Sequence, residues 1–263
     1  MIISGLETIR HPDYANIIWV RIETDEGLIG LGETFRGAAA VEAQIHAEIA
    51  PRLIGTDPSR IEGINAELTR PYVGYRSSGA EMRAASAIDL ALWDLAGKAV
   101  GRPLHDLLGG LTRPAIRTYN TCAGYAYNRS GARRAIAAAD APQGPYDDQI
   151  AAERDAGALA QSLLAMGIGA MKIWPFDPFA GATSGQLITA GEIDHALEPL
   201  RRIRSAVGDA MEVMIELHAL WDLPAALAIA RAAAPFRPLW MEDPLRNLDP
   251  RALADYRRRS GLP

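Results

Sequence analysis

The sequence contains a single cysteine, Cys122, among 263 residues. An internal disulfide is therefore impossible, and the cysteine pairs that are typical of secreted scaffolds are missing, so we expect a cytoplasmic protein. A lone cysteine is more often a small apolar filler than a nucleophile. No arrangement of histidines points to an activated thiol, so we do not expect cysteine chemistry here.

Long apolar runs and an excess of basic residues are missing as well. No stretch of about 18 uncharged apolar residues could span a membrane, and residues 1–5 lack the features of a signal peptide. The formal net charge is −5 and the pI about 5.6, whereas nucleic-acid-binding proteins favour basic patches. We therefore expect neither a membrane nor a nucleic-acid partner. An acidic substrate stays compatible with this charge, because a bound metal and one lysine can reverse the local sign.

Hydrophobic residues make up 49% of the chain, which is enough for a sizeable core in one large domain or two smaller ones. Alternating apolar and polar residues over 16–33, with Gly27 at the turn, predict a β-hairpin. Apolar residues at helical spacing predict helices over 38–50, 59–69 and 80–99. The buried stripe of the last helix is expected to be Ala84, Ile88, Ala91, Leu92 and Leu95.

The pattern changes near Pro114, so we expect one domain over 1–114 and a second over 115–263. In the second part, strands alternate with helices. The strands are expected at 115–121, 169–174, 211–217 and 238–242, and the helices at 149–166, 191–206, 223–234 and 249–259. Four β/α units in succession are the signature of a parallel sheet or barrel.

Glu216 and Glu242 each close a short apolar run, and they lie one β/α repeat apart. The carboxyl ends of successive parallel strands are where a β/α barrel carries its chemistry. Two hard oxygen ligands that converge there suit Mg²⁺. A single glutamate at such a place would be an ordinary strand-end carboxylate, but the pair at this spacing favours metal ligands.

Three further candidate residues lie at or near the carboxyl ends of predicted strands. Lys172 lies inside an apolar strand, which is costly unless it faces a polar cavity, although a lysine that reaches solvent at a strand edge is the alternative. Trp174 shares the face of Lys172, as a pocket wall or through simple packing. His218 follows Glu216 by two residues and could give a proton to a leaving group, or it could be a structural histidine bonded to backbone.

Several sequence motifs occur along the chain in the same order as in one known protein family. They are Gly30–Glu33, Ser86–Lys98 with Gly101–Leu104 and Leu107–Gly110, Lys172-x-Trp174, Glu216, and Glu242-Asp243-Pro244. With these motifs the chain resembles the mandelate racemase and muconate-lactonizing branch of the enolase superfamily. The resemblance implies an α/β protein, in which an N-terminal α+β capping domain precedes an enolase-type (β/α)₇β barrel. It also implies Mg²⁺ held by three carboxylates, a small carboxylate substrate that loses its α-proton, and a homo-oligomer.

Within that family, a histidine two residues after the first ligand resembles the dehydratases of sugar acids, in which it protonates the departing hydroxyl. Lys172 would then bind the substrate carboxylate or act as the base. Racemases and cycloisomerases often carry K-x-K, but here Trp174 stands at the second position. Glu216 replaces the more usual Asp. Substrate specificity is expected from the cap loops Thr34–Arg36 and Tyr72–Ser78, with Arg36 contacting the substrate or remaining a surface charge.

Residues 115–263 cover only the first half of such a barrel, which typically needs about 250 residues. The third ligand is expected one repeat past Glu242, hence beyond Pro263, and the family's later His–Asp dyad is expected there too. We therefore expect a part of a longer protein that does not catalyse alone. The leading hypothesis is a Mg²⁺-dependent acid-sugar dehydratase. A racemase or cycloisomerase and a non-catalytic fragment are the alternatives.

Overall fold

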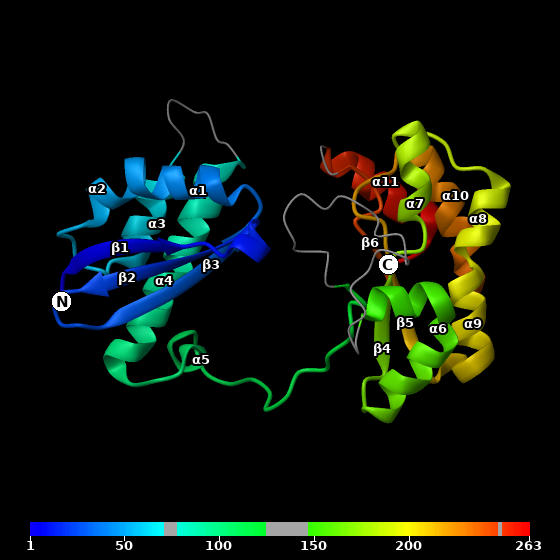
Figure 1. Ribbon diagram of the computed structural model, residues 1–263, viewed down its shortest axis with the longest axis horizontal. Coiled ribbons are helices and arrows are strands. Elements are labelled where there is room, and N and C mark those ends of the chain that lie inside the picture. The colour runs from blue at the N-terminus through cyan, green and yellow to red at the C-terminus, as the bar shows by residue number, and fades with distance from the viewer. Residues whose placement is uncertain (71–77, 125–146, 247–248) are drawn as a thin grey trace. The chain divides into compact units, whose positions relative to one another are not determined.

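The computed structural model describes residues 1–70, 78–124, 147–246 and 249–263. The chain divides into two compact units, one built on Met1–Ala115 and the other running from Ile116 to Pro263. Figure 1 shows the elements of each unit. We describe each unit by itself.

The first unit contains an antiparallel sheet with the order β1-β2-β3. Its strands are β1 (Ile3–Ile9), β2 (Ile17–Thr24) and β3 (Ile29–Phe35). Alternate residues of β2 are fully buried, and Gly27 takes a φ of 79° in the turn to β3. The predicted hairpin is confirmed, whereas β1 is an addition that the sequence pattern did not predict.

Helices follow the sheet of the first unit. They are α1 (Ala38–Gln44), a π-helical turn (Ile45–Ile49), α2 (Ala50–Leu53), α3 (Ile61–Thr69), α4 (Ala80–Val100) and α5 (Leu104–Leu107). The 21 residues of α4 pack against β3, and the predicted apolar stripe of this helix is buried. A Cβ on Gly32 or Gly30 would lie 1.9 or 2.1 Å from a carbonyl oxygen of α4, so these glycines permit the close approach.

The second unit contains a parallel sheet with the order β4-β5-β6. Its strands are β4 (Ala170–Ile173), β5 (Glu212–Glu216) and β6 (Met241–Glu242). The helices are α6 (Asp148–Ala165), α7 (Asp177–Ala180), α8 (Ala190–Ala196), α9 (Glu198–Val207), α10 (Leu223–Ala233) and α11 (Pro250–Ser260). Helices between parallel strands produce the β/α alternation that the sequence predicts.

Two predicted elements differ from the structure. The strand expected at 115–121 is reduced to one parallel bridge, in which Asn120 pairs with Met171. The helix expected at 191–206 is two helices that meet at Leu197. Pro199 has no backbone N–H to donate, and a proline inside a helix kinks or breaks it, so α9 begins with the proline in its first turn.

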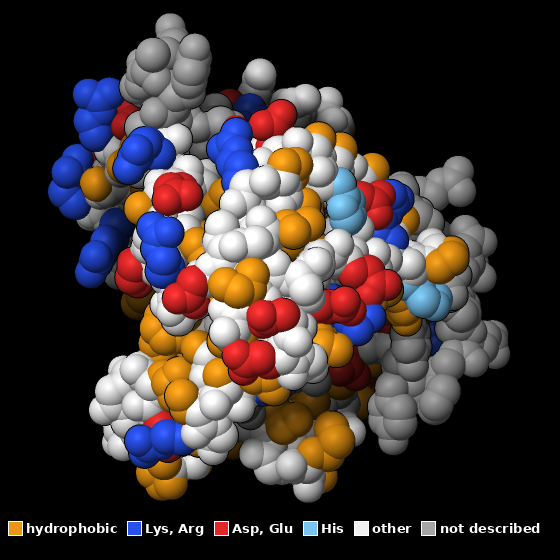
Figure 2. All heavy atoms as spheres, turned by 90° about the vertical axis from the view of Figure 1, so that its left-hand side faces the viewer, with side chains coloured by type: hydrophobic (Ala, Val, Ile, Leu, Met, Phe, Trp, Pro, Cys, Tyr) orange, Lys and Arg blue, Asp and Glu red, His pale blue; other side chains and the backbone are white. Residues whose placement is uncertain are grey.

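Surface charge is mixed. The face drawn in Figure 2 carries basic and acidic side chains among apolar ones. Several exposed ion pairs of the first unit, such as Arg10–Glu42 and Arg52–Glu48, combine the two signs. Among the helices that the structure describes, none is long and apolar enough to cross a membrane.

Candidate active site

Three charged side chains meet at the carboxyl ends of the parallel strands. Glu216 on β5 and Glu242 on β6 are register partners. Lys172 on β4 pairs with Met214, two residues before Glu216, so all three side chains share one face of the sheet. The Lys172 Nζ atom lies 3.0 Å from Glu216 Oε2 and 2.5 Å from Glu242 Oε1. The structure therefore brings together three of the residues that the sequence singles out.

This cluster is largely withdrawn from solvent. The side chains of Lys172 and Glu216 are 7% and 5% exposed, and that of Glu242 is 33% exposed. Burial alone would lower the pKa of Lys172, but hydrogen bonds to Glu242 and Glu216 outweigh it and raise that pKa. Burial raises the pKa of Glu216. Burial acts in the same direction on Glu242, but Lys172 and the Trp240 indole hold the pKa of Glu242 below its usual value.

The backbone after β5 wraps around the Glu216 carboxylate. Its Oε1 atom accepts hydrogen bonds from the N–H groups of Leu217 and His218, at 3.1 and 2.8 Å. His218 and Ala219 both take left-handed conformations, with φ of 48° and 54°. The N–H of Ala219 also donates to the carbonyl of Asp243, which ties this turn to the chain after β6. These backbone hydrogen bonds at the end of β5 thus fix the position of His218.

The His218 ring is held from the segment that follows β4. Its Nδ1 atom lies 2.6 Å from Oδ2 of Asp177, in the first turn of α7. The ring also makes an edge contact with Trp174, with centroids 4.8 Å apart and planes at 88°. Burial alone would lower the pKa of His218, but Asp177 outweighs it and raises that pKa. Trp174 therefore contacts the predicted site, as a wall against the histidine.

Two residues of this site escaped prediction from the sequence. Asp177 lies 41 residues from His218, and no spacing rule connects them. In the sequence, Asp177 stands before a proline at the start of a helix. An acidic residue is common in the first turn of a helix, so this position did not indicate a functional role. Tyr119 lies under the ammonium of Lys172, with its ring centroid 5.7 Å away. The segment that carries Tyr119 was expected to be a strand, but the sequence did not indicate that Tyr119 contacts Lys172.

Arg36 belongs to the first unit, whereas the other five predicted residues belong to the second. It directly follows β3 with a φ of 66°, and its guanidinium lies 5.3 Å from the ring centroid of Phe35. Its substrate contact stays a prediction. The second cap loop, Tyr72–Ser78, lies outside the described residues except for Ser78.

The residues present fit a magnesium ion in kind. Glu216 and Glu242 both direct an oxygen to one cationic atom, the Lys172 ammonium, so the two carboxylates converge on a single positive centre. Hard carboxylate oxygens are the ligands that Mg²⁺ prefers, usually few in number and completed by water or substrate. Within the described ranges, no group of three or more His, Cys, Asp or Glu residues could hold a metal. The assignment of Glu216 and Glu242 as metal ligands stays a prediction.

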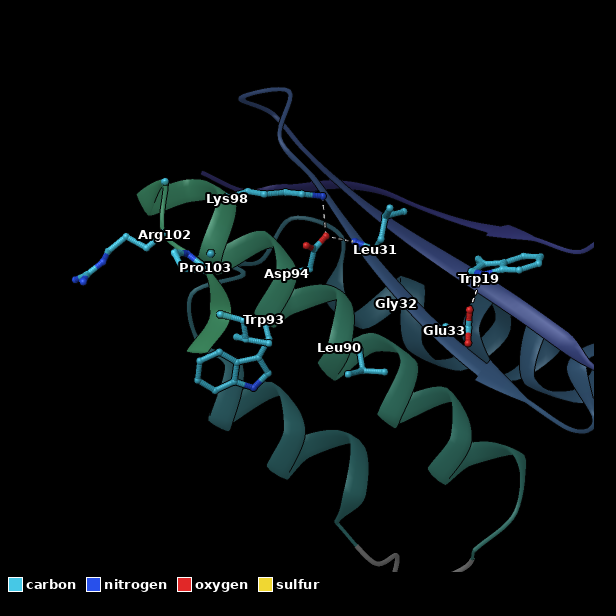
Figure 3. Close-up of a pocket in the computed structure, with 13 residues that line it drawn as sticks. Trp19, Leu31, Gly32, Glu33, Leu90, Trp93, Asp94, Lys98, Arg102 and Pro103 are labelled. Atoms are coloured by element: carbon cyan, nitrogen blue, oxygen red, sulfur yellow. Dashed lines mark hydrogen bonds and ion pairs between the residues drawn. The ribbon is translucent and has the colours of Figure 1, made fainter. Parts of the chain in front are cut away.

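A pocket of about 780 Å³ lies elsewhere, in the first unit between β3 and α4 (Figure 3). Its charged side chains already have partners, and Arg102, for example, pairs with Asp106. Asp94 accepts from Lys98 Nζ and from the N–H of Leu31, both at 2.7 Å, and Trp19 donates to Glu33. We assign the chemistry to the strand ends of the second unit instead, because charged groups of opposite sign are buried together there.

Comparison with known proteins finds a family match for each of the two parts of the chain. Residues 8–109 match the family profile "Mandelate racemase / muconate lactonizing enzyme, N-terminal domain", and residues 155–263 match "Enolase C-terminal domain-like". A D-galactonate dehydratase of Ralstonia nicotianae is 33% identical over 250 residues, which are 93% of this chain and 56% of that protein. A D-gluconate dehydratase of Thermoproteus tenax is 33% identical over 243 residues, 91% of this chain and 43% of that protein. The chain thus spans about half the length of the curated relatives it matches.

Solved structures give the same result. An enolase protein from the environmental genome sequencing of the Sargasso Sea is 46% identical, with a TM-score of 0.85, over 100% of this chain and 63% of that chain. An enolase of the mandelate racemase subgroup from Agrobacterium tumefaciens is 44% identical, with a TM-score of 0.84 and the same coverage. The fold is thus that of the enolase superfamily, with an N-terminal capping domain and a C-terminal enolase-like domain. The chain belongs to the mandelate racemase and muconate lactonizing enzyme family of the enolase superfamily.

Proposed function

We propose that this chain supplies the capping domain and the first half of the barrel of a Mg²⁺-dependent acid-sugar dehydratase. The observation that carries the proposal is the meeting of Lys172, Glu216 and Glu242 at the ends of three parallel strands, with His218 anchored beside them. The names of the relatives, D-galactonate and D-gluconate dehydratase, support this substrate class. The order β4-β5-β6, with helical connections, supports the barrel.

Glu216 and Glu242 would hold the metal. A bound Mg²⁺ would polarise the substrate carboxylate and stabilise the negative charge that develops when the α-proton leaves. Lys172 would add a second positive charge for the same carboxylate, since its ammonium is buried among carboxylates already. The two glutamates oppose loss of the ammonium proton, so carboxylate binding suits Lys172 better than the role of base. We assign the base to another part of the protein.

His218 would be the acid of the elimination. The base takes the α-proton, the C–O bond at the neighbouring carbon breaks with its electron pair, and the departing hydroxyl takes a proton from the His218 ring and leaves as water. The enol that remains becomes a 2-keto-3-deoxy acid after its own proton shift. The net change is the loss of one water molecule.

The test uses the purified whole protein, whose remaining part would supply the base and the third ligand, with Mg²⁺ and the acid sugars D-galactonate and D-gluconate. The expected result is release of a 2-keto acid, detected as its semicarbazone, and its loss in EDTA. In His218→Asn, water elimination should fall while the α-proton still exchanges with solvent deuterium. His195→Asn is the control, because His195 is an exposed histidine of the same unit. If elimination and exchange fall together, or neither falls, the acid role of His218 is wrong.

A racemase or cycloisomerase is the second candidate, favoured by the 44% identity to a structure of the mandelate racemase subgroup. Such an enzyme would exchange the α-proton and give an isomer of unchanged mass, so mass spectrometry of the product separates it from a dehydratase. A non-catalytic binding protein is the third reading. Calorimetry that finds acid-sugar binding with no dependence on Mg²⁺ would support that reading.

A further inference from the structure

We propose that Asp177 is a positioning residue, which fixes His218 as a donor through Nδ1 so that the proton given to the leaving group comes from Nε2. This inference rests on the acid role proposed above for His218. The observation behind it is the 2.6 Å contact between Asp177 Oδ2 and His218 Nδ1.

The contact joins two different strand ends. Asp177 follows β4, and His218 follows β5, so the pair does not arise from a local turn. Both side chains are largely buried, with exposures of 26% and 22%. The other carboxylate oxygen of Asp177, Oδ1, is buried and has no hydrogen-bond partner among the described residues. The carboxylate is thus committed to the imidazole.

The rest of the His218 residue is held as well. Its backbone N–H donates to Glu216, and its ring meets Trp174 at a near right angle. The backbone, the ring plane and one ring nitrogen are therefore each set by a different neighbour. A general acid needs such restraint, because its proton must lie within hydrogen-bond reach of the leaving atom.

A carboxylate at Nδ1 decides which nitrogen carries the mobile proton. A neutral imidazole has one N–H, and an acceptor at Nδ1 holds that proton there. The proton that is gained and lost is then the one on Nε2. In the elimination, the Nε2–H bond breaks as the hydroxyl leaves as water, and Asp177 keeps the Nδ1 proton. A third group that orients the acid–base residue in this way is a general device of enzyme sites.

The alternative is that the pair only ties two loops together. Another contact already does this, because the N–H of Asp222, after β5, donates to the carbonyl of Gly185, after β4, at 2.9 Å. Asp222→Asn is therefore a matched control. It removes the ion pair between Asp222, in the loop that carries His218, and Arg246, after β6, and it keeps the contact between Asp177 and His218.

The experiment compares the wild type with Asp177→Asn, Asp177→Ala and Asp222→Asn in the whole protein, which would include the base. Nitrogen NMR of the five histidines reports which ring nitrogen carries the proton in the neutral form. We expect Nδ1–H for His218 in the wild type and in Asp222→Asn, and a shift toward Nε2–H in Asp177→Ala. With D-galactonate or D-gluconate in D₂O, elimination should fall by about 10²-fold in both Asp177 variants. Exchange of the α-proton should stay within about twofold.

The two readouts separate this inference from the proposed function. Nε2–H in the wild type, or an unchanged tautomer in Asp177→Ala, overturns the positioning role even if the protein is a dehydratase. Equal losses of exchange and elimination in Asp177→Asn also overturn it. Full elimination in His218→Asn would instead refute the acid role, and the NMR result would still decide whether Asp177 fixes the ring.

Discussion

The Lys172 ammonium pairs with both Glu216 and Glu242, so its removal tests how the two carboxylates are held together. Lys172→Met leaves Glu216 buried and facing Glu242 without a counter-charge. Breaking a fully buried pair costs about 3–5 kcal/mol, and the partial exposure of Glu242 reduces this. We expect a loss of about 2 kcal/mol in the free energy of unfolding, measured by urea denaturation in EDTA.

The control is Lys98→Met, in the first unit. Lys98 pairs with Asp94 at 2.7 Å, but both side chains are well exposed. Exposed ion pairs contribute at most about 1 kcal/mol, so Lys98→Met should lose less free energy of unfolding than Lys172→Met. Added Mg²⁺ should stabilise Lys172→Met more than the wild type, since the ion would replace the missing charge. Equal stability of Lys172→Met and the wild type in EDTA would contradict this account.

Cys122 provides a prediction about pH. Its side chain is 2% exposed, and burial raises the pKa of the thiol from 9.0 to about 12. At pH 8 the thiolate fraction is about 10³-fold smaller than for a free thiol, so Ellman's reagent should react slowly until the protein unfolds. Because the unfolded thiol ionises first, stability should fall as pH rises above 9.0, until the folded thiol ionises as well. Reaction at the rate of a free thiol would show that Cys122 is accessible.

At the scale of elements, the contact between β3 and α4 depends on the absence of a side chain. A Cβ on Gly32 would lie 1.9 Å from the carbonyl oxygen of Ala87. Gly32→Ala should therefore lower the free energy of unfolding by about 3 kcal/mol, measured by urea denaturation. Gly5→Ala, in β1 of the same sheet, is the control, since its nearest atom would be 3.6 Å away. Similar losses in the two variants would mean that sheet propensity, and not the close approach, sets the cost.

The elements that could be predicted were those with a strong apolar period. Helix α4 and the hairpin of β2 and β3 carry such periods, and both formed as expected. Strand β1 was missed because its apolar and polar residues alternate weakly, since its sequence includes Gly5 and Glu7. It forms its sheet hydrogen bonds with β2. The strand expected at 115–121 has apolar residues, but a strand needs a paired neighbour along its length, and only Asn120 has one.

The same contrast holds for the site. Lys172, Glu216 and Glu242 could be placed together because parallel strands bring their ends to one edge. Asp177 could not, because its contact with His218 depends on how the chain folds back after β4. Tyr119 depends in the same way on one bridge beside β4. Strand ends follow from sequence periodicity, whereas loop contacts follow from tertiary packing.

At the scale of the whole molecule, each unit has a hydrophobic core of its own, and the strands that carry the candidate site contribute Ile173, Ile215 and Met241 to the core of the second. A ligand that binds only the folded state stabilises it by mass action. Mg²⁺ at 100 times its dissociation constant should add about 2.7 kcal/mol, measured as a rise in the unfolding midpoint that EDTA reverses. Glu216→Gln and Glu242→Gln should each weaken this response. A response that both variants keep would place the metal elsewhere.

The two left-handed residues after β5 have a consequence for efforts to make this protein more heat-resistant. Ala219 takes a φ of 54°, which glycine adopts without cost, so Ala219→Gly should raise the free energy of unfolding by about 0.5–1 kcal/mol. The same change would let the neighbouring His218 sample more orientations. Selection for thermal tolerance should therefore favour glycine at this position, whereas selection for turnover should favour alanine. Melting temperature and turnover measured on this one variant would show whether the two selections oppose each other here.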